Sequence, residues 1–438
     1  MRAYIVVDLG FGDCGKGLLT DFLARQCEAG LVVRYNGGAQ AGHNVVTPDG
    51  RQHTFSQFGS GTFIPGVKTY LSKHVVVHPG ALLVEGDILV KAGVGDAFAR
   101  IRVSDQALMI TPFHQAANHI REIGRGENRH GSCGVGVGEA VEDALAHPDD
   151  CVRAGDLADL ARLRRKLRAI RERKRGQLVE LYGDQLAEVA LAREWKIFER
   201  EDVVETWIAS LARIGELGLV APDGVLPGWL RDAGTVIFEG AQGVLLDAEA
   251  GFHPYTTWSN CTGANSQELI RELAPGSEVF QIGVMRSYAV RHGPGPLPTE
   301  TDLLTPVISE HNTYNKWQGA VRYGWFDGVL ARYAMEVAGG VDALAVTHID
   351  VVGKMKRWRY CREYRGMVEK LRMARGLTME ERAKVTQMLQ EVAPVIEDCD
   401  AEEGEVAQKI EELVGVKVGI VSRGPRAGDV KIVKAFPR

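Results

Sequence analysis

A junction near the N-terminus reads Asp8-Leu9-Gly10-Phe11-Gly12-Asp13-Cys14-Gly15-Lys16-Gly17. It follows the apolar, strand-like run 3–7 and precedes residues 18–29, whose apolar side chains recur at helical spacing. From Gly10 to Lys16 it fits G-x-x-x-x-G-K, in which glycines let backbone N–H groups surround phosphate oxygens and the lysine adds a mobile charge. The junction predicts a nucleotide-phosphate site formed by Gly12, Gly15, Lys16 and Gly17.

Gly17 stands where ordinary nucleotide-hydrolysing enzymes have a serine or threonine, whose hydroxyl binds magnesium. The metal therefore needs another ligand, and Asp13, inside the loop, is the candidate. A second Gly-rich segment, 34–44, begins at the end of the strand-like run 30–35 and contains His43. Because open α/β sheets bind ligands at the carboxyl ends of their strands, we expect His43 beside the phosphate loop. A purely structural role remains the alternative for both segments.

Strand-like runs recur along the chain with helical stretches between them, at residues 4–9, 30–35, 75–77, 235–238, 279–284, 341–346 and 416–421. This alternation predicts an α/β fold with a large, mostly parallel central sheet and flanking helices. Residues rich in Leu, Ala, Arg and Glu predict a helical subregion at about 153–230, and a charged stretch predicts a variable helical segment at about 370–412 with an acidic loop at 398–403. No linker or repeat divides the chain, so we expect one domain over residues 1–438.

The composition points away from polyanions, membranes and disulfide frameworks. The net charge of -5 gives no general attraction for nucleic acid, and the basic residues near 162–166 alternate with leucines as on a solvated helix face. Seven scattered cysteines, with no C-x-x-C pair, indicate neither disulfides nor zinc. The N-terminus has no signal-peptide pattern, and no apolar run is long enough for a membrane span. We expect a cytoplasmic protein.

Together, the phosphate loop and the segment 34–44 resemble the adenylosuccinate synthetase family, whose patterns there are close to G-D-E-G-K-G-K and G-G-x-N-A-G-H. Five further blocks match in the family's order, at 238–243, 254–260, 288–300, 322–327 and 422–425. The resemblance covers most of the chain. It implies a P-loop-like GTP-binding ligase fold, and an enzyme that joins IMP and L-aspartate with GTP and Mg²⁺ to form adenylosuccinate. It also implies a homodimer.

The resemblance implies a two-step reaction. Asp13 would take the proton from N1 of the purine, so that the 6-oxygen attacks the γ-phosphate of GTP, and an amine would then displace the phosphate. His43 would donate a hydrogen bond to the transferring phosphoryl group, and Gln242 would orient the reacting edge of the base. Gly42 would join Asp13 as a magnesium ligand. A role for Asp13 as metal ligand alone is the alternative.

The segment Thr347-His348-Ile349-Asp350 is similar to the family's T-K-x-D, which binds guanine. Asp350 can accept hydrogen bonds from guanine N1–H and N2–H₂, a donor pair that adenine lacks. His348 stands in place of the lysine that covers the base, so any cationic contribution there should depend on pH. The turn containing Ser422 and Gly424 would close over the same base.

The acceptor and amino-acid positions depart from the family. Gln40 replaces an asparagine, and Ser132 and Cys133 stand where the family has two threonines, whereas Thr257 remains. The implied acceptor residues are Asp13, Gln40, Ser132, Cys133, Gln242 and Thr257. The family's Arg-rich run has changed, which leaves Lys316 and Arg322 to bind the carboxylates of the amino acid.

The sequence thus predicts a GTP-dependent ligase that acts on IMP or a close analogue with aspartate or another amino acid. Its expected partners are these small substrates and GTP, without nucleic acid or membrane. Three alternatives stay open: a GTP-binding or GTP-hydrolysing regulator, a ligase of the same mechanism with a non-IMP acceptor, and a catalytically inactive scaffold.

Overall fold

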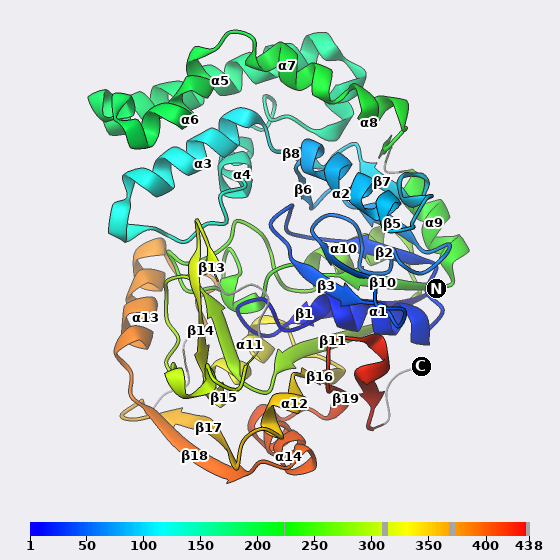
Figure 1. Ribbon diagram of the computed structural model, residues 1–438, viewed down its shortest axis with the longest axis vertical. Coiled ribbons are helices and arrows are strands. Elements are labelled where there is room, and N and C mark those ends of the chain that lie inside the picture. Colours follow the sequence, from blue (N-terminus) through cyan, green and yellow to red (C-terminus); the bar gives the residue numbers. More distant parts are fainter. Residues whose placement is uncertain (223, 309–313, 368–370, 372, 435–438) are drawn as a thin grey trace.

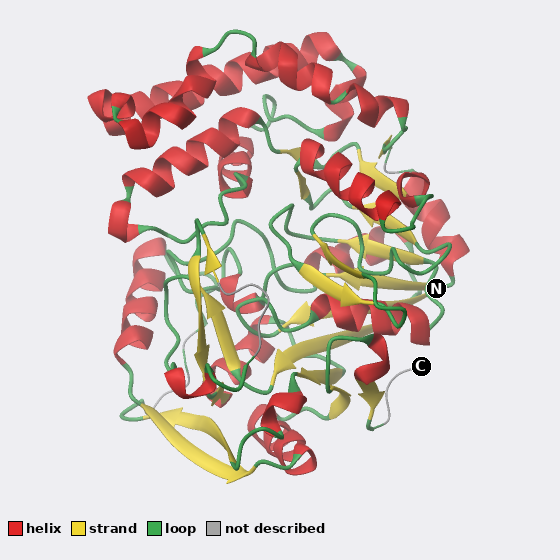
Figure 2. Cartoon of the chain, in the orientation of Figure 1, coloured by secondary structure: helices red, strands yellow, loops and turns green. Residues whose placement is uncertain are grey.

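The computed structural model describes residues 1–222, 224–308, 314–367, 371 and 373–434. Its largest feature is a ten-stranded sheet (Figures 1 and 2). The strands of this sheet are β1 (Arg2–Asp8), β2 (Leu31–Arg34), β5 (Lys68–Leu71), β7 (Ile101–Ser104), β9 (Val220–Ala221), β10 (Thr235–Glu239), β11 (Glu278–Arg286), β16 (Ala343–Thr347), β19 (Val418–Ser422) and β20 (Val430–Ile432).

The strand order is β20-β19-β16-β11-β1-β10-β2-β5-β7-β9. Every neighbouring pair is parallel except β19 and β20, which are antiparallel. The prediction of an α/β fold with a large, mostly parallel sheet is therefore confirmed. The strand-like run 75–77 was expected in the central sheet. This expectation is wrong, because residues 76–77 form a strand of a separate two-stranded sheet.

The central strand β1 shows why the sheet forms there. Its residues Ala3, Ile5 and Val7 face one hydrophobic core, and Tyr4 and Val6 face a second core on the other side. All five are completely buried, as expected for a parallel strand covered on both faces. Helix α1 (Lys16–Gln26) covers the second face with Leu19 and Leu23. The apolar run before the phosphate loop therefore forms a central strand, β1, that is buried between two hydrophobic cores.

Four small sheets surround the main one. They consist of β12 (Ala289–His292), β14 (Gly319–Gly324) and β13 (Tyr314–Asn315); β15 (Phe326–Asp327), β17 (Arg357–Tyr364) and β18 (Pro394–Asp400); β3 (His43–Val46) and β4 (Gln52–Phe55); and β6 (Val76–Val77) and β8 (Leu108–Met109). The expected acidic loop at 398–403 is wrong, because residues 398–400 end strand β18. There the Nε of Arg357, on the paired strand β17, donates to Asp398 at 2.9 Å.

The remaining helices are α2 (Pro79–Lys91), α3 (Pro112–Gly124), α4 (Val137–Ala146), α5 (Leu160–Tyr182), α6 (Val189–Glu199), α7 (Val203–Ser210), α8 (Ala212–Glu216), α9 (Val225–Ala233), α10 (Ala264–Leu273), α11 (Gly328–Val337), α12 (Ile349–Val352), α13 (Met379–Glu391) and α14 (Glu403–Val414). Figure 1 shows α5 to α8 as a layer at one end of the molecule. Residues 223, 370 and 372, within the two expected helical segments, lie outside the described residues. No helix in the described part of the chain combines the length and the apolar character needed to span a bilayer.

Candidate active site

The loops at the carboxyl ends of adjacent strands β1, β10, β11 and β16 contact one another. A Cβ on Gly243, after β10, would lie 2.1 Å from the oxygen of Gly10, so only glycine fits against the phosphate loop there. Arg286, at the end of β11, donates from Nε to the carbonyl of Asp13 at 2.5 Å. Thr347, at the end of β16, donates to the carbonyl of Cys14 at 2.7 Å. These contacts fix the phosphate loop where α/β sheets bind ligands.

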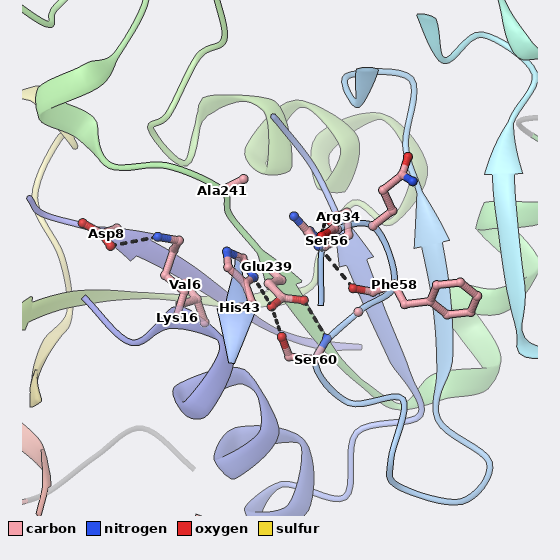
Figure 3. Close-up of polar contacts among 12 residues, drawn as sticks. Val6, Asp8, Lys16, Arg34, His43, Ser56, Phe58, Ser60, Glu239 and Ala241 are labelled. Carbon is pink, nitrogen blue, oxygen red and sulfur yellow. Dashed lines mark hydrogen bonds and ion pairs between the residues drawn. The ribbon is translucent and has the colours of Figure 1, made fainter. Parts of the chain in front are cut away.

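The carboxylate of Asp8 organises the inside of the loop (Figure 3). One oxygen accepts from the amide of Gly10 at 2.9 Å, and the other accepts from the amide of Cys14 at 3.0 Å. The second oxygen also accepts from Lys16 Nζ at 2.8 Å, the contact drawn in Figure 3. Both side chains of the Asp8–Lys16 pair are buried. Burial alone would lower the pKa of Lys16, but Asp8 raises it above its usual value, so the ammonium group stays charged.

The absence of a side chain at Gly17 has a packing cause. A Cβ there would lie 2.8 Å from the Cβ of His43 and 2.9 Å from its carbonyl carbon. Helix α1 therefore approaches strand β3 too closely for serine or threonine at this position. From the sequence, Gly17 was notable only because it lacks the hydroxyl that usually binds magnesium. In the structure, the lack of a side chain at residue 17 also lets His43 lie against the start of α1.

His43 belongs to a buried chain of polar contacts (Figure 3). Its Nδ1 lies 2.6 Å from Glu239, and Glu239 also accepts from the amide and hydroxyl of Ser60. Burial lowers the pKa of His43 to about 4, so the ring is neutral, and a proton on Nδ1 satisfies Glu239. Nε2 is then an acceptor. Donation from His43 to a phosphoryl group, as expected from the sequence, requires a second proton on Nε2.

Backbone strain coincides with the predicted site. In the described part of the chain, the non-glycine residues with positive φ are Asp13 at 48°, Glu28 at 48°, Gln242 at 56° and His348 at 57°. This conformation costs most side chains about 1–3 kcal/mol and persists where the surroundings enforce it. Three of these four positions were predicted as site residues from the sequence alone.

Asp13 is the exposed carboxylate of the loop. Its side chain is 40% accessible, and its Oδ2 lies 2.6 Å from His292 Nε2. Partial desolvation by the loop would raise the pKa of Asp13, but the hydrogen bond with His292 and the charges of Arg286 and Lys16 outweigh this effect and hold the pKa well below the usual range. Asp13 is therefore an ionised carboxylate facing the site, with His292 as a neighbour that the sequence did not predict.

Two amide side chains near the loop have unpaired buried oxygens. The Oε1 of Gln242 and the Oε1 of Gln40 have no hydrogen-bond partner among the described residues. A Cβ on Gly37 would meet Gln242 Oε1 at 2.8 Å, which places this amide against the turn after β2. Buried polar atoms without partners are uncommon, so both amides are candidates for contacts with a bound molecule.

The other predicted acceptor residues lie on separate loops. Ser132 accepts from Asn118 at 2.9 Å, and burial raises the pKa of the neighbouring Cys133 to about 11, so the thiol is uncharged. The amide of Thr257 donates to the carbonyl of Leu246 at 2.8 Å. Within the described residues, no hydrogen bond joins these three side chains to Asp13 or Gln242.

The predicted base-binding residues follow β16 and β19. His348 is the N-cap of helix α12, and burial and the charge of Arg286 hold its pKa well below the usual value. The ring is neutral at physiological pH, which corrects the expected pH-dependent cation. Burial, Glu403 and Asp429 raise the pKa of Asp350. Ser422 donates to the carbonyl of Gly424 at 2.8 Å, which closes the turn between them.

Four residues that shape this site were assigned no role from the sequence: Asp8, Glu239, Arg286 and His292. Glu239 and His292 lie inside sequence blocks that match the family, which was the available signal. Their partners, His43 and Asp13, are distant in sequence, so only the fold reveals the contacts.

We expect His292→Leu to lower turnover about 10-fold, because a hydrogen bond to a charged group is lost and Asp13 is partly solvated. His292→Gln retains an N–H donor and should recover part of the activity. The measurement is the steady-state rate of phosphate release at saturating substrates, with the thermal unfolding midpoint as the control. Full activity in His292→Leu would contradict a role in holding Asp13.

The chain is similar to adenylosuccinate synthetases over nearly its whole length. A family model described as adenylosuccinate synthetase matches residues 5–430. The adenylosuccinate synthetase of Mycobacterium leprae is 31% identical over 448 residues, covering 97% of this chain and 96% of that protein. That of Caldanaerobacter subterraneus subsp. tengcongensis is 30% identical over 449 residues and covers 100% of both chains.

Two solved structures share the fold. The fully ligated adenylosuccinate synthetase from Plasmodium falciparum matches with a TM-score of 0.78 at 20% identity, covering 99% of this chain and 100% of that one. The cyanophage S-2L succinoaminodeoxyadenylate synthetase, bound to dGMP and dATP as an energy donor, matches with a TM-score of 0.61 at 17% identity, covering 99% and 96%. With its sequence matched from residue 5 to residue 430, the chain belongs to the adenylosuccinate synthetase family of GTP-dependent ligases, which form a carbon–nitrogen bond.

Proposed function

We propose that this enzyme phosphorylates the 6-oxo group of a purine nucleotide, IMP or a close analogue, and displaces the phosphate with the amine of aspartate or another amino acid. The observation that carries the proposal is the strained pair Asp13 and Gln242 beside the phosphate loop. One presents an ionised carboxylate and the other an unpaired amide oxygen. A purine edge with an N1–H and a 6-oxygen needs a base and a positioning amide of this kind.

Each residue then has a role in the reaction. Asp13 takes the N1 proton and increases the negative charge on the 6-oxygen, which attacks the γ-phosphate of GTP. Lys16 exchanges its contact with Asp8 for phosphate oxygens. The added negative charge raises the pKa of the neighbouring His43, whose Nε2 then takes a proton from solvent and donates a hydrogen bond to the transferring group. Gln242 holds the purine so that its 6-oxygen points at the phosphate.

The residues around Asp13 fit a magnesium ion. Mg²⁺ is commonly bound by one or two carboxylates together with phosphates and water, and Asp13 with the carbonyl of Gly42 would provide the protein share. The described residues contain no group of three or more His, Cys, Asp or Glu placed to hold a metal, so phosphate oxygens would complete the shell. A bound ion would neutralise charge on the transferring phosphate.

Two further expectations belong to the proposal. All seven cysteines are free thiols, which suits a reducing, cytoplasmic compartment. We also propose a homodimer, on the strength of family membership. The uncharged Cys133 and the presence of Gln40 in place of the family's asparagine favour a changed site for the acceptor's 5′-phosphate. A non-IMP purine is therefore the second candidate acceptor.

The test is to incubate the protein with Mg²⁺, GTP, an acceptor and an amino acid, and to measure phosphate release together with the mass of the purine product. We expect phosphate release to require the acceptor and the amine. Rapid hydrolysis of GTP without either substrate, and no new purine product, would instead favour a GTP-hydrolysing regulator.

The choice of guanine can be tested at Asp350. Asp350→Asn replaces an acceptor pair with a group that also donates, so the preference for GTP over ATP should fall about 10-fold or more. The measurement is kcat/KM for each nucleotide. The comparison with ATP is pertinent because the cyanophage relative was captured with dATP as energy donor. An unchanged GTP-to-ATP ratio would remove Asp350 from base recognition.

A further inference from the structure

Arg322, which the sequence predicts to bind a carboxylate of the amino acid, is engaged by other groups of the protein. Arg322, on β14, donates from Nε to the carbonyl of Gly293 at 3.0 Å and from a terminal nitrogen to the carbonyl of Gly295 at 2.7 Å. Its other terminal nitrogen donates to Glu300 at 2.7 Å. Arginine binds carboxylates best through two parallel N–H groups on one edge. In Arg322, one such edge is occupied by the two backbone carbonyls, and Glu300 neutralises the charge of the guanidinium group.

Two further arginines, Arg291 on β12 and Arg286 on β11, are engaged in the same manner. Arg291, at 2% exposure, donates to three backbone carbonyls and lies 4.2 Å from the centre of the Phe11 ring. Arg286 donates to the Asp13 carbonyl and to the hydroxyl of Tyr288. These guanidinium groups support the loops of the site and present no open edge to a substrate carboxylate.

Lys316 differs from these arginines. It is exposed, and no carboxylate lies within ion-pair distance of it in the part of the chain that the structure describes. Its Nζ lies 5.0 Å from the centre of the Trp317 ring. That indole stacks on His119 of α3, with 4.1 Å between ring centres and 12° between planes. Lys316 is thus a cation held on a rigid aromatic support.

The stacked pair Trp317 and His119 also connects the loop that carries Ser132 and Cys133 to residues 314–322. A Cβ on Gly134 would lie 2.4 Å from Trp317, so the loop that carries Ser132 and Cys133 touches this indole directly. His119 fixes the arrangement, because one ring nitrogen lies 2.7 Å from the carbonyl of Gly134 and the other lies 3.0 Å from Glu194 on α6. On its other side, the segment 314–322 lies against Gly293, because a Cβ there would meet the carbonyl oxygen of Gln318 at 2.5 Å, and the adjacent His292 contacts Asp13. Lys316 and Trp317 therefore lie close to both the acceptor loop and the catalytic carboxylate.

We propose that the amine donor is an α-amino acid whose only carboxylate is its α-carboxylate, bound by Lys316, with an uncharged side chain against Trp317. The inference rests on the proposed ligase function. L-Aspartate brings two carboxylates, whereas the described residues 314–322 offer one cation without a carboxylate or carbonyl partner, so a second carboxylate would have no cation to pair with. An indole surface favours an uncharged side chain instead.

The bond changes are those of the ligase reaction. The amine nitrogen forms a bond to C6 of the purine, and the C6–O bond to the phosphorylated oxygen breaks. The electron pair of that bond leaves with phosphate, which also takes up the proton that the neutral amine loses. Donor identity changes only the group attached to the nitrogen, so one assay compares all donors.

The experiment compares matched donors: L-aspartate with L-asparagine, and L-glutamate with L-glutamine, each with Mg²⁺-GTP and with IMP, GMP or dGMP as acceptor. We expect kcat/KM for the amides to exceed that for the acids by about 10-fold or more, because of the unpaired charge. Aspartate performing as well as asparagine would overturn this inference alone. Absence of product with every donor and acceptor would overturn the proposed function itself, and the inference with it.

Variants separate recognition from folding. Lys316→Met should raise the KM for the donor about 10-fold with kcat nearly unchanged, and Trp317→Arg, which adds a cation, should shift preference toward aspartate. Lys384→Met, an exposed lysine on α13 with 69% of its side chain accessible, is the matched control. An unchanged donor KM in Lys316→Met, with an unchanged thermal midpoint, would refute the assignment of Lys316.

Discussion

Asp13→Asn should bind GTP but lose turnover by about 10³-fold, because the substitution removes the base while keeping the shape of the side chain. Asparagine tolerates positive φ better than most residues, so the strained turn should survive. Two measurements check this: the rate of product formation at saturating substrates, and GTP affinity by titration calorimetry.

The thermal unfolding midpoint serves as the control for this variant. A midpoint near that of the parent protein, together with intact GTP binding, would assign the loss to chemistry. Turnover within a few fold of the parent enzyme would remove Asp13 from the catalytic step and leave it, at most, as a metal ligand.

Lys16→Met should destabilise the protein by about 3 kcal/mol, because it leaves the buried carboxylate of Asp8 without its cation. Two backbone amides still donate to Asp8, so we expect the lower end of the range for a broken buried pair. GTP affinity should fall as well, since the loop loses the ammonium group that we propose to bind the phosphates. Denaturant unfolding gives the stability, and titration with GTP gives the affinity.

The double variant Lys16→Met with Asp8→Asn distinguishes the two effects. Without a charge on residue 8, most of the lost stability should return, whereas GTP affinity should stay low. If the double variant is no more stable than Lys16→Met alone, the Asp8–Lys16 pair does not account for the loss.

The sequence predicted the centre of the sheet well and its margins poorly. Strands β1, β10 and β11 are apolar runs buried on both faces, so their pattern is visible without the fold. Strands β5, β7 and β9 have only two to four residues, and their pairing with neighbours stabilises them more than their composition does. The acidic residues that end β18 looked like a loop, because their partner Arg357 is about 40 residues away.

The candidate site likewise contains residues that the sequence could predict and residues that it could not. Lys16 and Asp13 lie in one compact Gly-rich motif, so a phosphate contact and a metal ligand could be predicted from spacing, whereas the role of Gln242 and the base role of Asp13 followed only from the resemblance to the family. The partners of these residues could not be predicted. The carboxylate that holds His43 is 196 residues away, and the hydrogen bond between His292 and Asp13 joins strand β12 to the phosphate loop, which become neighbours only in the folded chain. The aromatic stack that supports Lys316 likewise joins α3 to the segment before β14.

The contact between Gly17 and His43 limits how this fold can exchange features with ordinary nucleotide-hydrolysing enzymes. Installing their hydroxyl at residue 17 would push the histidine away before it could bind any metal. An ancestor with that hydroxyl would have needed a different path for β3, so no single substitution connects the two designs. For protein engineers, α1 and the β3–β4 hairpin that carries His43 form one unit that must be transplanted together.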